Sequence, residues 1–93
     1  MFNDYVEDTT LDLNALMIDH PAATFFVRMS GDSMRGAGIF ADDLLVVDRS
    51  LDPKKDDIIL AVTDGEFTVI KLTGKEKELQ VWGVITYVIH KTR

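Results

Sequence analysis

The first regularly spaced apolar residues favour one or two turns of helix, and they are Leu11, Leu13, Leu16, Met17 and Ile18. Thr9 or Thr10 is suited to cap this helix, because a threonine hydroxyl accepts a hydrogen bond from an unpaired amide of the first turn. The helix should end at His20–Pro21, since a residue before proline is pushed out of the helical conformation. The pattern therefore predicts a single short amphipathic helix near the start of the chain.

From residue 22 onward the apolar residues occur in runs that are typical of strands. These runs are rich in β-branched and aromatic residues, and Gly, Asp and Ser separate them. Asp64-Gly65 fits a two-residue hairpin turn, and Gly83 marks a bulge or bend in the last run. The predicted strands cover residues 24–29, 44–47, 57–63, 66–72, 79–82 and 84–89. Five or six short strands of this kind indicate a mainly β domain.

Length and charge limit the organisation of the chain. Its 93 residues fit one domain. Residues 1–10 are acidic without apolar periodicity, so we expect a flexible arm there and a folded domain over residues 11–93. The net charge of −6 argues against direct binding of nucleic acid, which requires a basic face.

The residue types that the chain lacks narrow its chemistry. It contains no cysteine, which excludes disulfides, thiolate nucleophiles and Cys-based metal sites. Two histidines cannot build a tight zinc site without carboxylates, and we expect no cofactor. No stretch approaches the roughly 20 apolar residues of a membrane span. Residues 1–20 also lack the basic start of a secretory signal, so we expect a cytoplasmic protein without a membrane partner.

The segment Ser30–Met34 (SGDSM) directly follows a predicted strand. A serine in a tight, glycine-containing turn can expose its hydroxyl while nearby backbone N–H groups converge on one point, as an oxyanion hole requires. Ser, Gly and Asp are also ordinary turn residues. The motif alone therefore leaves a catalytic and a structural interpretation open.

Lys71 is the only charged side chain in the apolar run of residues 67–72, and by strand alternation it shares a face with Phe67 and Val69. One interpretation is a strand-end lysine whose ammonium reaches water. The other is a lysine desolvated by apolar neighbours, whose neutral amine serves as a general base beside a serine. Taken by itself, Lys71 favours the first interpretation.

The remaining polar and aromatic residues have structural explanations. We expect His20 at a helix end and His90 exposed on the last strand, although spacing alone does not rule out a Ser-His-Asp site around His20. The adjacent acids Asp42-Asp43 and Asp56-Asp57 precede strands, where acids commonly form turns. Trp82 and the five phenylalanines are candidate core residues.

Taken together, these residues resemble the LexA/UmuD family of self-cleaving serine peptidases, which use a Ser-Lys dyad. The resemblance covers nearly the whole chain, in residues 4–7, 11–16, 20–27, 30–34, 38–39, 43–48, 64–72 and 81–85. It implies a small compact domain of curled antiparallel sheets, mainly β, with one short N-terminal helix.

The resemblance also implies roles for individual residues. Ser33 falls on the family's nucleophile and Lys71 on its general base, with the backbone N–H groups of Asp32 and Ser33 as candidates for the oxyanion hole. Family members carry further strands between the lysine strand and the last strands, where this chain has only residues 73–78. Because of that departure, the sequence does not establish whether the far wall of the substrate groove is present or whether the domain is an active peptidase.

The implied biological role is that of a processed, shortened UmuD form, because the family's self-cleavage site lies upstream of the matching region. Ala37-Gly38 has a suitable dipeptide composition, but it lies within a matched loop and is rejected as the scissile bond. The resemblance implies a homodimer that serves an error-prone translesion DNA polymerase as an accessory subunit in the SOS response. A RecA-type filament would activate the full-length form. The alternative is the non-catalytic dimerisation domain of a LexA-like repressor.

Overall fold

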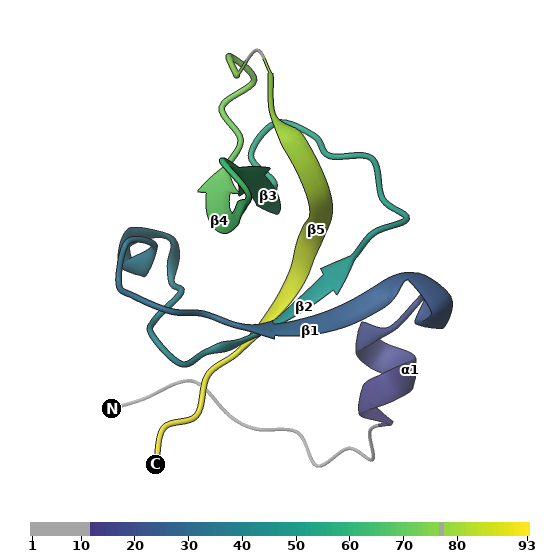
Figure 1. The fold of residues 1–93 in the computed structure, drawn as a ribbon. Coiled ribbons are helices and arrows are strands. Elements are labelled where there is room, and N and C mark those ends of the chain that lie inside the picture. Colours follow the sequence, from purple (N-terminus) through teal and green to yellow (C-terminus); the bar gives the residue numbers. More distant parts are fainter. Residues whose placement is uncertain (1–11, 77) are drawn as a thin grey trace, which may run out of the picture.

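The computed structural model describes residues 12–76 and 78–93, and it folds into one antiparallel sheet with the strand order β1-β2-β5-β3-β4 (Figure 1). The predicted mainly β class with one short helix is confirmed. The strands are β1 (Thr24–Arg28), β2 (Leu44–Asp48), β3 (Ile58–Thr63), β4 (Glu66–Lys71) and β5 (Gln80–Ile89). Besides the helix α1 (Leu13–Met17), two 3-10 turns occur, η1 (Pro21–Ala23) and η2 (Arg35–Ala37).

The helix α1 is shorter than predicted, and its cap differs. Asp12 is the N-cap, because its carboxylate accepts hydrogen bonds from the amides of Asn14 (3.0 Å) and Ala15 (3.4 Å). Thr9, Thr10 and the predicted arm of residues 1–10 lie outside the described residues. In the part of the chain that the structure describes, no helix has the length and apolar character needed to cross a membrane.

The hairpin and the bulge that the sequence predicts are both present. Asp64 and Gly65 have φ angles of 52° and 79°, the two positive values that a tight two-residue hairpin turn requires. The two last predicted strands are one continuous strand, β5. The pairing of β3 with β5 shifts between Leu60–Gly83 and Ala61–Val81, which leaves Trp82 as the extra residue of a bulge.

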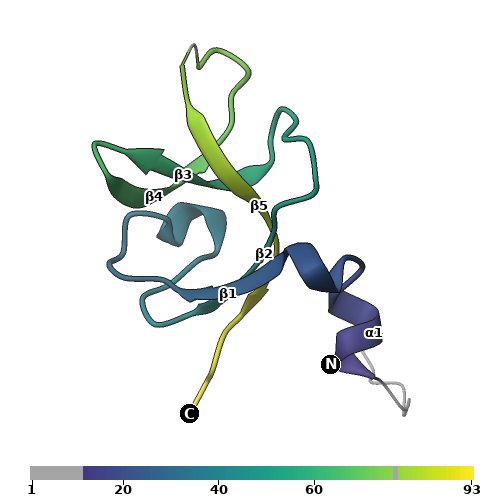
Figure 2. The ribbon, with the colours of Figure 1, turned by 45° about the vertical axis from the view of Figure 1, so that its right-hand side comes forward.

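The sheet curls around β5, because one end of this strand pairs with β3 and the other with β2. The edge strands β1 and β4 consequently face each other across the concave side, and η2 lies in the opening between them (Figure 2). The concave side holds the main core, whose buried residues are Met29, Ile39, Leu45, Val47, Leu60 and Ile85. A smaller cluster of Ile59, Ala61 and Val84 forms a second apolar core.

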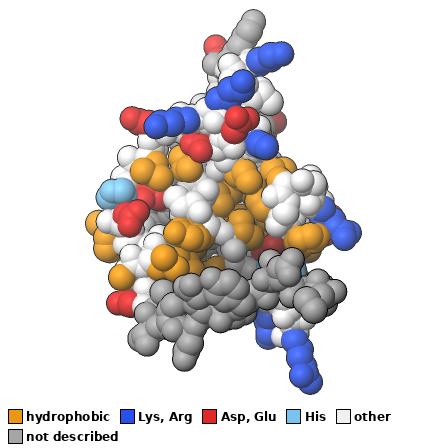
Figure 3. All heavy atoms as spheres, turned by 180° about the vertical axis from the view of Figure 1, so that it is seen from behind, with side chains coloured by type: hydrophobic (Ala, Val, Ile, Leu, Met, Phe, Trp, Pro, Cys, Tyr) orange, Lys and Arg blue, Asp and Glu red, His pale blue; other side chains and the backbone are white. Residues whose placement is uncertain are grey.

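Several phenylalanines are not core residues, contrary to the expectation from sequence. The exposed fractions of Phe25, Phe26 and Phe67 are 43%, 52% and 58%. Phe25 and Phe67 instead meet Trp82 edge-on, with ring centroids 5.1 and 5.4 Å from it, so aromatic contacts join both edge strands to β5. Further apolar side chains gather in the middle of the surface seen from behind (Figure 3).

We predict that Gly83→Ala lowers the free energy of unfolding by about 1–3 kcal/mol, the usual cost of overpacking. A Cβ at Gly83 would lie 2.5 Å from Cγ1 of Val47, a fully buried side chain with nowhere to move. Urea unfolding measures the loss. Gly36→Ala is the control, because a Cβ there meets nothing within 4 Å. A Val47→Ala/Gly83→Ala double variant should lose less than the sum of the single variants, and strict additivity would contradict the steric explanation.

Candidate functional site

The connection from β1 to β2 carries the serine motif and is closed at its base by two backbone hydrogen bonds. The amide of Met29 donates to the carbonyl of Asp43 at 2.8 Å, and the amide of Asp42 donates back to the carbonyl of Met29 at 2.9 Å. We call residues 29–43 the serine loop. Gly31 has a φ of +86°, a conformation that disfavours any side chain, and it allows the tight turn before Ser33.

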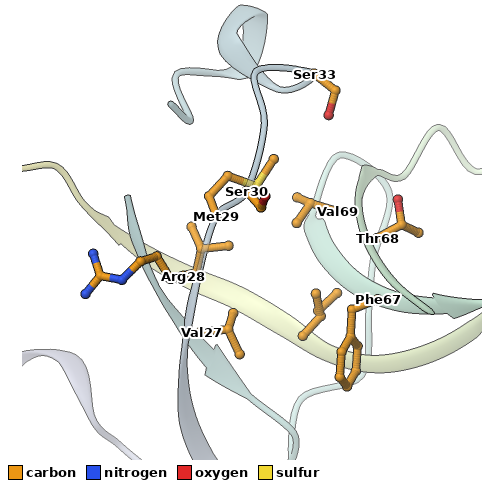
Figure 4. Close-up of a pocket in the computed structure, with 10 residues that line it drawn as sticks. Val27, Arg28, Met29, Ser30, Ser33, Phe67, Thr68 and Val69 are labelled. Carbon is orange, nitrogen blue, oxygen red and sulfur yellow. The ribbon is translucent and has the colours of Figure 1, made fainter. Parts of the chain in front are cut away.

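Ser33 lines a cavity of about 280 Å³ between the serine loop and the two edge strands (Figure 4). Ser33 comes from the upper loop in this view, while Val69 of β4 points toward Met29 and Ser30. Six of the ten residues that line it are apolar, Val27, Met29, Leu45, Leu60, Phe67 and Val69, and the other four are Arg28, Ser30, Ser33 and Thr68. The serine hydroxyl therefore lies beside walls that combine apolar and polar side chains.

The backbone around Ser33 forms a tight turn whose two amides the sequence predicts as an oxyanion hole. The carbonyl of Asp32 accepts the amide of Arg35 at 3.2 Å, which folds the turn back on itself. Among residues 12–76 and 78–93, the amides of Asp32 and Ser33 have no hydrogen-bond acceptor. Both N–H groups are thus available to an incoming oxygen, as electrostatic stabilisation of an oxyanion requires. Met34 packs against the main core.

Lys71 is the last residue of β4, pairs in register with Ile58 and is exposed. It is not one of the residues that line the cavity, although Val69 on the same face of β4 does. In the described part of the chain, no hydrogen bond joins Lys71 to Ser33. The Ser33 turn therefore lies beside β4, the strand that carries Lys71. Lys71 itself lies two residues beyond Val69, the nearest residue of the cavity lining on its face of the strand.

Two buried aspartates that sequence reasoning assigned no partner lie at the two ends of β2. Asp48 is 4% exposed and Asp43 is 2% exposed. Nδ1 of His20 lies 2.7 Å from Oδ2 of Asp48, and Nδ1 of His90 lies 2.5 Å from Oδ1 of Asp43. The one signal in the sequence is an acidic residue at each end of the apolar run of β2. It does not identify the histidines, because they lie 28 and 47 residues away in the sequence.

The Asp48 pair does not form a catalytic triad. The Ser50 hydroxyl and amide donate to Oδ1 of Asp48 at 2.6 and 2.8 Å, so the carboxylate separates Ser50 from His20. A nucleophilic serine would have to donate to the imidazole itself. Burial acts to raise the pKa of Asp48, but hydrogen bonds from Ser50 and His20 outweigh it and hold this pKa below its ordinary value. The same carboxylate raises the pKa of His20 through its hydrogen bond and its charge.

At the other end of β2, Asp43 organises the serine loop. The Phe40 amide donates to Oδ2 of Asp43 at 2.8 Å, and this bond is the main reason that the pKa of Asp43 lies below its ordinary value despite burial. The bond from His90 acts in the same direction. The other acids have structural roles in turns: Asp42 and Asp56 adopt positive φ angles. The described residues contain no group of side chains that could hold a metal ion.

Comparisons with known proteins identify a family for the chain. The model of the family described as Peptidase S24-like matches residues 1–82. The chain is 48% identical to Protein SamA of Salmonella typhimurium, an alignment that covers 97% of this chain and 75% of SamA. It is 44% identical to Protein ImpA of Escherichia coli, with 97% and 74% covered, and 33% identical to Protein MucA of Escherichia coli, with 87% and 69% covered.

The alignment with SamA also shows that the relative is longer inside the matched region. It runs over 106 positions, whereas 97% of the 93-residue chain is only about 90 residues, which leaves about 16 positions without a residue here. That difference is large enough for two short strands of about 5–6 residues and their turns. It agrees in size with the short connection over residues 73–78.

We predict that the stability of the protein falls as the pH rises through the folded-state pKa of His20. This pKa is raised above the ordinary value of 6.5, so the bond to Asp48 contributes in full below pH 6.5 and loses its ionic part above the folded value. Asp43 and Asp48 act oppositely: their contribution is present above the ordinary pKa of 3.8 and is lost as the pH falls through the lowered folded values.

Urea unfolding at a series of pH values tests the His20 contribution. His20→Asn keeps a neutral donor and should abolish the decline that follows the titration of His20. Ser50→Ala removes a donor that does not titrate, so it should lower stability at every pH and keep the decline. The same decline in His20→Asn and in the unmodified protein would show that His20 is not its cause.

Proposed function

The chain belongs to the peptidase S24-like family, the family of LexA and UmuD, and on this premise we propose that it is an SOS mutagenesis protein of the UmuD type. In this role it serves an error-prone translesion DNA polymerase as an accessory subunit. The observation that carries the proposal is the position of Ser33, within the matched serine motif, at a cavity between the two edge strands. The net charge of −6 suits a subunit that contacts proteins and leaves DNA to its partner.

The groove has the properties of a site for an extended peptide. Both β1 and β4 are edge strands, so each has one row of backbone N–H and C=O groups that no neighbouring strand of the sheet pairs. A peptide segment can add to such an edge through its main chain and place alternate side chains against the apolar walls. Thr68 and Ser30 add polar groups beside Ser33.

If the site cleaves a peptide, its chemistry uses Ser33 and Lys71. The neutral amine of Lys71 takes the proton of the Ser33 hydroxyl, and the oxygen attacks the peptide carbonyl to form a tetrahedral adduct. The N–H groups of Asp32 and Ser33 stabilise its negative oxygen. Protonated Lys71 then gives its proton to the leaving amine, and water hydrolyses the acyl-serine ester.

For this chemistry, the amine of Lys71 has to reach Ser33 when a peptide occupies the groove. The flexible stem of Lys71 must run back along β4 past Val69, over the roughly 7 Å that separate alternate residues of a strand. A bound peptide that excludes water would desolvate the amine and favour its neutral form.

Lys71 is exposed in the structure, which favours the second candidate, a non-catalytic dimerisation and regulatory domain like that of a repressor. A LexA repressor of Shewanella is 38% identical over 56 residues, or 60% of this chain.

Cleavage in trans tests the dyad. The substrate is full-length SamA in which alanine replaces the serine that corresponds to Ser33. We expect cleavage whose rate rises with pH, because only a neutral amine accepts the proton. Ser33→Ala and Lys71→Ala should each reduce the rate by about 10³-fold or more.

Two controls keep the assay specific. Thr63→Ala removes an exposed hydroxyl outside the cavity lining, and Lys75→Ala removes another exposed lysine beyond β4; both should retain cleavage. If the unmodified chain does not cleave, or if Lys71→Ala cleaves normally, the dyad is wrong and the non-catalytic candidate stands.

We also predict a homodimer that uses the end of β5. Tyr87, Val88 and Ile89 remain 36–39% exposed there, an apolar run that a second copy would cover. Ile89→Glu should shift the protein to monomer in sedimentation at micromolar concentration, because dimerisation would bury its charge. Thr63→Glu, an exposed change at the β3–β4 hairpin, should leave the dimer intact. A monomer in the unmodified protein would contradict this prediction.

A further inference from the structure

His90 follows β5 directly, and it makes two contacts with the serine loop at once. Its Nδ1 bonds to Oδ1 of Asp43 at 2.5 Å, and its ring lies against the ring of Phe40, with centroids 5.2 Å apart and planes inclined by 47°. Asp43 and Phe40 are themselves joined by the 2.8 Å bond from the Phe40 amide. His90 therefore holds the end of the serine loop that enters β2.

The contacts continue from Phe40 to the turn of Ser33. The guanidinium of Arg35 lies 5.3 Å from the centre of the Phe40 ring, a distance typical of a cation–π contact. The Arg35 amide donates to the carbonyl of Asp32, the residue before Ser33. A continuous series of contacts thus links His90 to the serine, and every member except His90 belongs to the serine loop.

The carboxylate of Asp43 is buried, so it depends on His90 as a hydrogen-bond donor. Asp43 is 2% exposed, and its two oxygens are satisfied by one donor each, the Phe40 amide and His90. Removing His90 leaves one oxygen of a buried carboxylate without its protein donor, which favours a rearrangement of the loop that carries it. The surrounding charges are Arg28, Asp42, Lys91 and Arg93, which line the recess around this pair, and Arg35 on Phe40.

We propose that His90 is a positioning residue for the Ser33 turn, which it holds through Asp43 and Phe40, so that the C-terminal segment of the chain controls the geometry at the cavity. The importance of that geometry for peptide binding or cleavage rests on the proposed function. The positioning itself does not, because it concerns only the order of the serine loop.

His20 provides a matched control for this role. Both histidines bond through Nδ1 to a buried aspartate at one end of β2, and the side chain of each is 49% exposed. His20 differs in that its partner, Asp48, bonds to Ser50 and not to the serine loop. A general loss of stability therefore affects both variants, whereas a loss of positioning affects only His90.

Amide hydrogen exchange in the intact chain tests the proposal. In His90→Ala we expect about tenfold faster exchange at the loop amides whose acceptors lie in the same loop, while His20→Ala leaves them unchanged. They include the amides of Arg35, Ala37, Gly38 and Ile39, which surround the Ser33 turn and η2. Ser33→Cys supplies an independent readout, because the chain has no other cysteine, and its reaction with a thiol reagent should change in His90→Ala but not in His20→Ala.

Two further variants separate the contacts of His90. His90→Asn keeps a donor near Asp43 and should restore most of the protection, whereas His90→Phe keeps a ring on Phe40 without a donor and should not. Unchanged exchange in His90→Ala, or an equal effect of His20→Ala, overturns the proposal whatever the peptidase assay shows.

If trans cleavage occurs, His90→Ala should lower kcat with KM little changed, because the groove walls on β1 and β4 remain. If no cleavage occurs but loop exchange responds as expected, the dyad fails and the positioning role stands.

Discussion

Gly83 lets β2 and β5 approach more closely than a residue with a Cβ would allow, and the shape of the domain depends on that approach. Cγ1 of Val47 occupies the space where a Cβ would stand, and the bulge beside Gly83 turns Trp82 toward the edge strands. Bulges increase the local twist of a strand. The resulting curl brings β1 and β4 to opposite sides of one cavity, and a flat sheet of the same strands would leave Ser33 on an open surface.

The strand β2 connects this framework to both ends of the described chain. Its two buried aspartates bond to His20, just before β1, and to His90, just after β5. Burying an ionised carboxylate is costly unless hydrogen bonds satisfy it, so each aspartate constrains the segment that supplies its donor. The polar groups at the ends of β2 thus fix where the segments before β1 and after β5 lie, which apolar packing alone would not specify.

The candidate site combines a preformed backbone with a lysine that the proposed chemistry requires to move. The Ser33 turn is held by Gly31, by the bond between Arg35 and Asp32, and by the closed base of the serine loop. Lys71 has no comparable support, since it is exposed at the end of an edge strand. The family relationship and the groove are therefore properties of the chain, whereas the proposed catalysis requires a rearrangement that peptide binding would have to stabilise.

The sequence by itself determined the local features. Runs of β-branched and aromatic residues located the strands to within one or two residues, except that β5 was predicted as two strands. The positive φ angles of Asp64 and Gly65 follow from the residue types. Only the tertiary structure decided the strand order, the exposure of Phe25 and Phe67, and the partners of Asp43 and Asp48. The reason is physical: a local pattern restricts the backbone of its own segment, whereas burial and hydrogen-bond partners depend on residues far away in the chain. For the same reason the sequence placed Lys71 on the face of β4 that carries Val69, and only the fold showed that it stands beyond the cavity lining.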